Sequence, residues 1–185
     1  MDRRLQRIIL ASASPRRREL MGEAGFDFDV IPADIDESKI SAKSPRMLVK
    51  KLSLAKADAI KVDGALIIGA DTVVVYGGKV FGKPHTAENA KKMLSTLCGK
   101  WHSVYTGVSV ICDGKTKCFA VKSRVKLRAL NAKEIEECVE RTKPFDRRVR
   151  TEYRTDFSWK NTKAVLRISS DCPWKNSQAC LRDLE

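Results

Sequence analysis

Short apolar runs alternate with helix-opening motifs along most of this chain of 185 residues. Runs with the apolar content or the two-residue alternation of strands occupy residues 7–11, 26–31, 65–69, 73–76, 79–81, 104–111 and 118–127. Helices are predicted at 14–24 and 44–59, where Ser-Pro supplies a cap and a first helical residue, and at 86–97 and 132–140. Because strands and helices alternate, the sequence predicts an α/β fold.

Two of these elements carry predictions about polar residues. The strand at 65–69 is predicted to end at Ala70-Asp71-Thr72, so that Asp71 lies where α/β proteins place ligands. The helix after Ser44-Pro45 is predicted to turn one apolar face to the core, and Lys56 then falls on its polar side. That face consists of Leu48, Leu52, Ala55 and Ala59.

The composition is that of a globular protein in water, with 43% hydrophobic and 32% charged residues. No stretch approaches the roughly 20 apolar residues that cross a bilayer, and the first residues lack the apolar run of a secretion signal. We therefore expect a cytoplasmic protein. The six cysteines form no Cys-x-x-Cys pair and have no histidine at ligand spacing, so we expect reduced thiols and no zinc site.

The net charge of +13 calls for an anionic partner. A nucleic acid, an acidic membrane and a phosphorylated small molecule all satisfy it, and charge alone does not choose among them. The dense basic run at 147–150 favours nucleic acid, but no basic strand with interleaved aromatics and no helix-turn-helix pattern supports that choice. We therefore do not favour nucleic acid as the partner.

The junction between the first strand and the first helix has the make-up of a phosphate site. Backbone N–H groups, the positive end of the helix dipole and the hydroxyls of Ser12 and Ser14 converge there. The guanidiniums of Arg16 and Arg17 add two cations. An ordinary capped helix with solvated arginines explains the same residues, so both interpretations stay open.

Two carboxylates and two lysines elsewhere can complete such a site. Asp71 can hold a divalent cation or take a proton from an attacking water, and Glu37 in an acidic loop can share that duty. Lys83, in the stiff turn Gly-Lys-Pro, and Lys56 can neutralise phosphate charge. The alternatives are an aspartate that caps a turn and lysines that are merely solvated. We assign His102 to packing or to the surface.

Four motifs follow one another along the chain: LASASPRRREL at 10–20, GADTVV at 69–74, GKP at 82–84 and LCGKWHSVYTGV at 97–108. Each motif is weak by itself. Together, in this order and with these gaps, they resemble the Maf family of nucleoside triphosphate pyrophosphatases over roughly the first 146 residues.

This resemblance implies an inosine-triphosphatase-like, or Maf-like, α/β fold in which a mixed sheet with flanking helices surrounds a central cleft. It implies hydrolysis of the α–β bond of dTTP or UTP, or of a related or modified nucleotide, with Mg²⁺ or Mn²⁺ as cofactor. Asp71 is then the catalytic proton acceptor and, with Glu37, a metal ligand. The substrate-binding residues that the resemblance implies are Ser12, Ser14, Arg16, Arg17, Lys56, Thr72 and Lys83. Arg16 and Thr72 resemble the branch that acts on dTTP and UTP, and a homodimer is left open.

The chain departs from the family after Asp146. All ten glycines lie at or before Gly114, and residues 147–185 show neither helical nor strand periodicity. The motifs with which the family continues are missing, including a glutamine that helps to read the base. We therefore divide the chain into a Maf-like nucleotide pyrophosphatase domain, 1–146, and an atypical C-terminal segment, 147–185, and expect the altered C-terminus to weaken activity.

A shift of reading frame near Asp146 is our hypothesis for this change. Codons compatible with residues 147–154, read in one offset frame, can encode Ala-Gly-Ala-Tyr-Gly-Ile-Gln, the continuation typical of the family. Coding DNA that does not yield these residues in the offset frame contradicts the hypothesis. Two functional alternatives also stay open: a catalytically inactive Maf relative in cell-division regulation, and a basic nucleic-acid-binding protein.

Overall fold

The structure is a computed structural model that describes residues 7–142. The atypical segment 147–185, the domain boundary at 146 and the hypothesis of a frame shift all lie outside the described residues. The described residues form a mixed sheet with four helices, which confirms the predicted α/β class.

The element bounds follow the predicted ones closely for the helices. The helices are α1 (Pro15–Glu23), α2 (Pro45–Asp58), α3 (Ala87–Leu97) and α4 (Ala132–Thr142), and a short 3-10 turn, η1, spans Glu37–Lys39. The strands are β1 (Ile8–Leu10), β2 (Asp29–Val30), β3 (Leu66–Tyr76), β4 (Lys79–Phe81), β5 (Trp101–Cys112) and β6 (Lys115–Lys126). Capping explains the agreement: Ser44 Oγ accepts from the Met47 N–H at 3.3 Å, and Thr86 Oγ1 from the Asn89 N–H at 3.2 Å.

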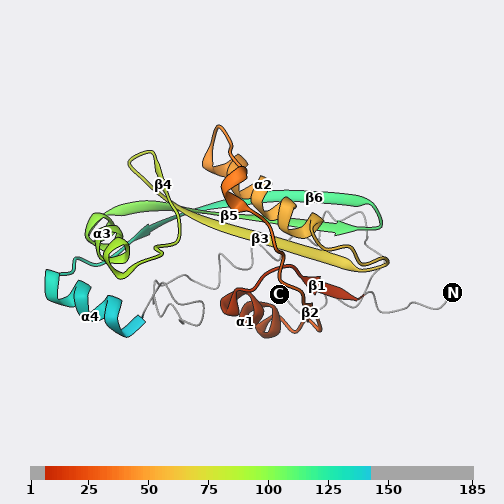
Figure 1. Cartoon of the computed structure of the whole chain (residues 1–185), viewed down its shortest axis with the longest axis horizontal. Coiled ribbons are helices and arrows are strands. Elements are labelled where there is room, and N and C mark those ends of the chain that lie inside the picture. The colour runs from red at the N-terminus through yellow and green to blue at the C-terminus, as the bar shows by residue number, and fades with distance from the viewer. Residues whose placement is uncertain (1–6, 143–185) are drawn as a thin grey trace, which may run out of the picture.

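The strands form one sheet in the order β2-β1-β3-β5-β6, with β4 paired to β3. β1 runs parallel to β2 and β3, whereas β4, β5 and β6 pair antiparallel with their neighbours. In Figure 1, α2 lies along the long strands, α1 lies beside β1, and α3 and α4 lie together at the other end of the molecule. The site described below forms where the short and the long strands meet.

β3 differs from its prediction. The sequence predicts two strands, with Asp71 and Thr72 just after the first, but the structure has one continuous strand of 11 residues with both inside it. The prediction that Asp71 follows a strand end is therefore wrong. Pairing with β5 from Ile67 to Val75 holds this polar pair in the sheet, and a local pattern of apolar residues does not reveal such a partner.

The buried face of α2 also differs from its prediction. The side chains that it buries are Val49, Leu52, Ser53, Lys56 and Ala57. The cause is a close approach between α2 and the sheet at two glycines: a Cβ on Gly69 would lie 2.2 Å from the Ser53 carbonyl oxygen, and one on Gly107 2.2 Å from that of Val49. Small side chains face the strands there, and Lys56, predicted on the polar side, is buried instead.

Three apolar clusters stabilise the described residues, and the smallest joins β3 to β5 through Ala70, Val108 and Val110. Another joins the C-terminal half of α2 to β1 and β3 through Ile9, Ala11, Ala57, Ile60, Ala65 and Ile67. The third joins α3 to α4 through Ala90, Leu94, Ile135 and Val139. A reciprocal cap starts α4, because the Asn131 side chain accepts from the Glu134 N–H at 2.9 Å and the Glu134 carboxylate accepts from the Asn131 N–H at 2.8 Å. The long strands thus connect two packed regions.

Candidate active site

The sheet is interrupted on one side of β3. β1 pairs with the first three residues of β3, Leu66 to Ile68, and β4 pairs with the last three, Val74 to Tyr76. Between them, residues 69–73 pair with β5 on one side and with no described strand on the other. We call residues 69–73 the open edge of β3. Asp71 lies at its centre.

Lys56 connects two carboxylates at this edge. Its Nζ lies 2.5 Å from Asp71 Oδ1 and 2.9 Å from Glu37 Oε1. Lys56 and Asp71 are buried, with 7% and 6% of their surface exposed, whereas the Glu37 side chain is 45% exposed. The close contact between α2 and Gly69 places the Lys56 ammonium inside the protein. Burial of this charge is costly unless it is paired, and the two carboxylates compensate it.

Arg17 reaches the same edge from the first turn of α1. Its Nη1 donates to Ser12 Oγ at 2.9 Å, and its Nη2 lies 3.5 Å from Thr72 Oγ1. The Ser12 hydroxyl also accepts from the Ser14 N–H at 3.3 Å, so it holds the start of α1 and the guanidinium together. Thr106, on β5, lies 3.1 Å from Thr72 through the two hydroxyls. The sequence reasoning missed Thr106, because only the β3–β5 register reveals it.

The charges of these groups act on one another. Burial raises the pKa of Glu37, but the hydrogen bond and charge of Lys56, with Lys83 and Arg17 farther off, outweigh it and leave that pKa below its ordinary value. Burial lowers the pKa of Arg17, against the opposing effect of Asp71 and Glu37. Glu37 is therefore ionised at neutral pH and faces three cations.

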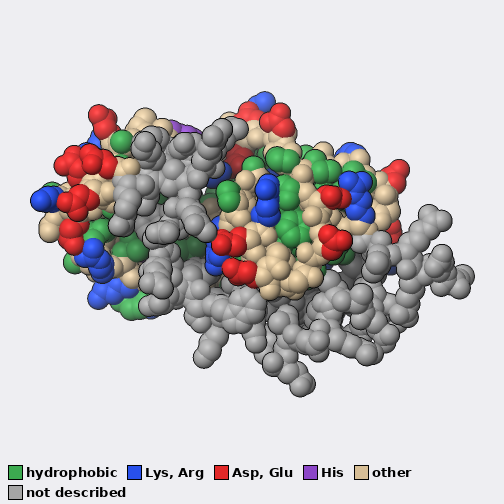
Figure 2. All heavy atoms as spheres, turned by 90° about the horizontal axis from the view of Figure 1, so that it is seen from below, with side chains coloured by type: hydrophobic (Ala, Val, Ile, Leu, Met, Phe, Trp, Pro, Cys, Tyr) green, Lys and Arg blue, Asp and Glu red, His purple; other side chains and the backbone are tan. Residues whose placement is uncertain are grey.

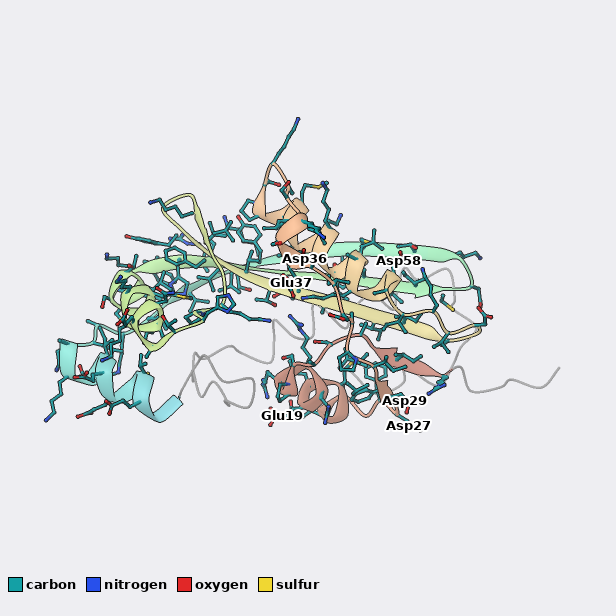
Figure 3. All side chains as sticks on the ribbon, viewed as in Figure 1. Glu19, Asp27, Asp29, Asp36, Glu37 and Asp58 are labelled. Atoms are coloured by element: carbon teal, nitrogen blue, oxygen red, sulfur yellow. The ribbon has the colours of Figure 1, made fainter. Side chains whose placement is uncertain are left out.

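Figure 3 shows how the labelled carboxylates differ in position. Glu37 lies close to the middle of β3, whereas Glu19 lies on α1, and Asp27 and Asp29 lie by β2. Figure 2, seen from below, shows basic and acidic side chains interspersed on this face of the molecule.

The structure does not bring every predicted residue into this cluster. Arg16 is exposed; it donates a hydrogen bond to Glu19 at 2.9 Å and forms an ion pair with Glu23 at 3.6 Å, both on α1. Ser14 caps α1 without a side-chain hydrogen bond. Lys83 influences Glu37 through its charge and also lines an open cavity of about 280 Å³ between β4 and α3. The role of each predicted site residue stays a prediction.

His102 and the described cysteines lie apart from this chemistry. His102 is 7% exposed, and its Nδ1 lies 3.4 Å from the Lys100 carbonyl oxygen, which fits packing. Among the described residues, Cys98, Cys112, Cys118 and Cys138 form no disulfide with one another.

The carboxylates of Glu37 and Asp71 fit a hard divalent cation whose remaining ligands come from the substrate. Glu37 and Asp71 both lie within hydrogen-bond reach of one ammonium, so their oxygens can approach a common cation. Within residues 7–142, no three histidine, cysteine or acidic side chains gather to hold a metal by themselves. Mg²⁺ is commonly held by one or two carboxylates, with phosphate oxygens and water as the other ligands. The two carboxylates present match that pattern.

The fold and the site define a class: an α/β protein with cationic side chains beside paired carboxylates at the middle of its sheet. Residues 7–148 match the family described as "Maf-like protein". The chain belongs to the Maf family, which confirms the resemblance found in the sequence.

Several relatives share most of the chain. It is 46% identical over 141 residues to the dTTP/UTP pyrophosphatase of Thermosipho africanus, covering 76% of this chain and 73% of that protein. It is 43% identical over 145 residues to the enzyme of the same name from Thermotoga maritima, covering 76% and 70%. A Bacillus cereus protein of that name is 39% identical, covering 77% and 76%. The solved structure of the Staphylococcus aureus Ham1 protein aligns with a TM-score of 0.45 and 19% identity, over 65% of this chain and 71% of that one.

Proposed function

We propose that this chain is a nucleoside triphosphate pyrophosphatase that hydrolyses dTTP and UTP to the monophosphate and pyrophosphate. The observation that carries the proposal is the buried Lys56, which joins Asp71 to Glu37 beside the guanidinium of Arg17. The substrates in this proposal are those in the names of the relatives. We assign them to this chain because its sequence is 39–46% identical to those proteins.

Each residue of the cluster has a physical role in this reaction. Water attack on a phosphorus that carries several negative charges is slow until cations cancel the repulsion and the nucleophile is aligned. Arg17 and Lys83 supply positive charge to the phosphates, and Ser12 fixes the guanidinium of Arg17. Asp71 accepts the proton of the attacking water as the bond between phosphorus and the bridging oxygen breaks. Lys56 donates to Asp71 and so holds its carboxylate in one orientation.

The cofactor that we propose is Mg²⁺ or Mn²⁺. Glu37 and Asp71 would hold it together with the substrate phosphates. When bound, the cation supplies further charge neutralisation to the phosphoanhydride.

Pyrophosphate release from dTTP, UTP and 7-methyl-GTP in Mg²⁺ tests the function. We expect turnover of dTTP and UTP above that of 7-methyl-GTP, at a rate lowered by the altered C-terminus, and a kcat about 10²–10⁴-fold lower in Asp71→Asn. A folded chain that hydrolyses none of them contradicts the proposal and favours the inactive relative in cell-division regulation. Salt-sensitive binding to DNA or RNA without hydrolysis would favour the nucleic-acid-binding protein, which nothing in the site favours.

The proposed location is the cytoplasm, and a homodimer is left open. In the part of the chain that the structure describes, none of the helices has the length and apolar character needed to cross a membrane. Fractionation of cells that express the tagged chain tests the location.

A further inference from the structure

We propose that the open edge of β3 binds the uracil or thymine base of the substrate through the main chain of Ala70 and Thr72. This inference rests on the proposed function and deepens it, because it names the part of the site that holds the base. It assigns the phosphates to cationic side chains and the base to backbone groups.

The direction of the backbone groups follows from the neighbouring hydrogen bonds. The Leu66 N–H donates to the Arg7 carbonyl, and the Ile68 carbonyl accepts from the Ala11 N–H, both at 2.8 Å and both toward β1. A strand repeats every two residues, so the N–H and C=O groups of Ala70 and Thr72 point the same way. No described strand pairs with them on that side.

The order of these groups suits a base better than a phosphate. Along the edge, the N–H of Ala70, its C=O, the N–H of Thr72 and its C=O alternate as donors and acceptors. A phosphate offers only acceptors and would be repelled by the two carbonyls. Uracil and thymine carry the N3–H donor between two carbonyl acceptors, so one N–H and one C=O of the edge can be satisfied together.

The surroundings of the edge fit an occupant of nucleotide size. Six strand steps separate Ile68, the last residue paired with β1, from Val74, the first paired with β4, which is about 20 Å at ~3.3 Å per residue. Because β1 and β4 occupy the two ends of this gap, a long strand from another chain cannot pair with β3 there. Arg17 lies at Thr72, which places a phosphate-binding cation next to the base-binding groups. These contacts involve neither the 5-methyl group nor the sugar, which are the parts in which dTTP and UTP differ. The same contacts can therefore bind both nucleotides.

A binding experiment tests the inference without relying on turnover. The probe is α,β-imido-UTP, whose α–β bond resists hydrolysis, compared with the same compound methylated at N3. Calorimetry on the full chain should show at least 10-fold weaker binding of the methylated compound, because the methyl group removes the donor and prevents approach to the carbonyl. Tripolyphosphate, which has no base, should bind as a competitor through the side chains.

Two altered proteins separate the main chain from the side chain. Replacing the Thr72 amide by an ester, with the threonine side chain retained, removes the N–H from the open edge and makes the Asp71 carbonyl, which faces β5, a weaker acceptor. It should weaken binding of α,β-imido-UTP about 10-fold while leaving binding of tripolyphosphate unchanged. Thr72→Val removes the hydroxyl but keeps the N–H, so the preference over the N3-methyl compound should persist.

The outcomes distinguish this inference from the proposed function. Equal affinity for the methylated and unmethylated compounds, within twofold, overturns the base-binding role of the edge even where dTTP and UTP are hydrolysed. The inference is also overturned if the preference for the unmethylated compound disappears in Thr72→Val and survives in the ester. The Thr72 side chain, and not the main chain, would then bind the base. Failure to hydrolyse dTTP and UTP, with the 10-fold preference intact, contradicts the proposed function alone.

Discussion

The fold buries Lys56 and surrounds its ammonium with carboxylates. A lysine on a helix is usually solvated, and its charge then contributes little. Here its ammonium is buried and bonds to both Asp71 and Glu37. Removal of Lys56 therefore leaves the buried Asp71 carboxylate without this partner, whereas removal of either carboxylate leaves Lys56 paired with the other. The cluster therefore compensates a buried charge, in addition to the chemical role that we propose for it.

Replacing the proposed proton acceptor tests the chemical role. Asp71→Asn keeps the shape but removes the base, so we expect kcat to fall by about 10²–10⁴-fold. The matched control is Asp58→Asn, an exposed partner of Lys61, which should retain its kcat. The measurement is steady-state release of pyrophosphate from dTTP. An Asp71→Asn protein with at least half of the original kcat contradicts the assignment.

Glu37 should link stability to pH. Its pKa in the folded chain lies below the ordinary value near 4.3, so folding favours the ionised form. This contribution is fully present above the ordinary pKa and is lost as the pH falls through the folded value. Glu37→Gln should thus be less stable than the original chain at pH 7, by at most about 1 kcal/mol because the side chain is half-exposed, and the difference should shrink at pH 3.5.

Urea unfolding of both proteins at the two pH values measures this difference. Glu137→Gln, which changes an exposed carboxylate in the middle of α4, is the control for a general charge effect. A Glu37→Gln difference that grows on acidification would contradict the sign of the pKa shift.

At the scale of elements, the contact between α2 and the sheet positions the site. The backbone of the helix lies against Gly69 and Gly107, and Gly107 is the β5 partner of Asp71. The glycines are therefore needed for close approach rather than for an unusual backbone conformation. Ser53 and Ser109 reinforce the contact through their hydroxyls, 2.8 Å apart and buried.

Adding one methyl group at this contact should displace the helix. In Gly107→Ala the new Cβ would meet the carbonyl oxygen of Val49 at 2.2 Å and its carbon at 2.4 Å, and backbone cannot move aside as a flexible side chain can. We expect the free energy of unfolding to fall by about 1–3 kcal/mol, together with a loss of activity.

Gly22→Ala is the matched control for that change. Gly22 lies inside α1, and a Cβ there meets nothing within 4 Å, so the substitution should raise stability by about 0.5–1 kcal/mol. Urea unfolding and dTTP turnover of both variants give the comparison. A Gly107→Ala protein as stable as the original chain would show that α2 does not lie against β5 as described.

At the scale of the whole molecule, we expect the positive net charge to speed the encounter with an anionic substrate. The chain carries a net charge of +13, and Arg17, Lys56 and Lys83 lie at or near the open edge. Screening shortens the reach of this charge as salt rises.

We therefore expect kcat/KM for dTTP to fall by about 10-fold between 50 and 500 mM NaCl, with kcat changing much less. Initial rates across that range provide the measurement. Lys133→Gln, which removes one positive charge on α4 and away from the site, should behave as the original chain does. A kcat/KM independent of salt would exclude a role for long-range attraction.

Removal of divalent cations tests the proposed cofactor on the intact protein. EDTA should lower turnover by at least about 100-fold, since the phosphoanhydride then lacks a neutralising cation, and added Mg²⁺ or Mn²⁺ should restore it. Ca²⁺ serves as a comparison with a larger ion. Full activity in EDTA would contradict the proposal that Glu37 and Asp71 hold a metal.

The elements of this protein were largely predictable because their signals are local. Ser-Pro marked the starts of α1 and α2, and the short Asp113-Gly114 sequence, whose φ values are 47° and 72° in the structure, forms the turn of the hairpin between β5 and β6. The motifs also identified the family and most of the residues that the structure gathers at the open edge.

The sequence by itself determined the α/β class, the helix starts, the family and the residue types of the site. Tertiary structure decided that Asp71 lies within a continuous strand, that Lys56 is buried, that Arg16 points away, and that Thr106 and the backbone of β3 border the site. The physical reason is that these features depend on pairing and packing between segments distant in the chain. Caps and turns, by contrast, act over a few residues.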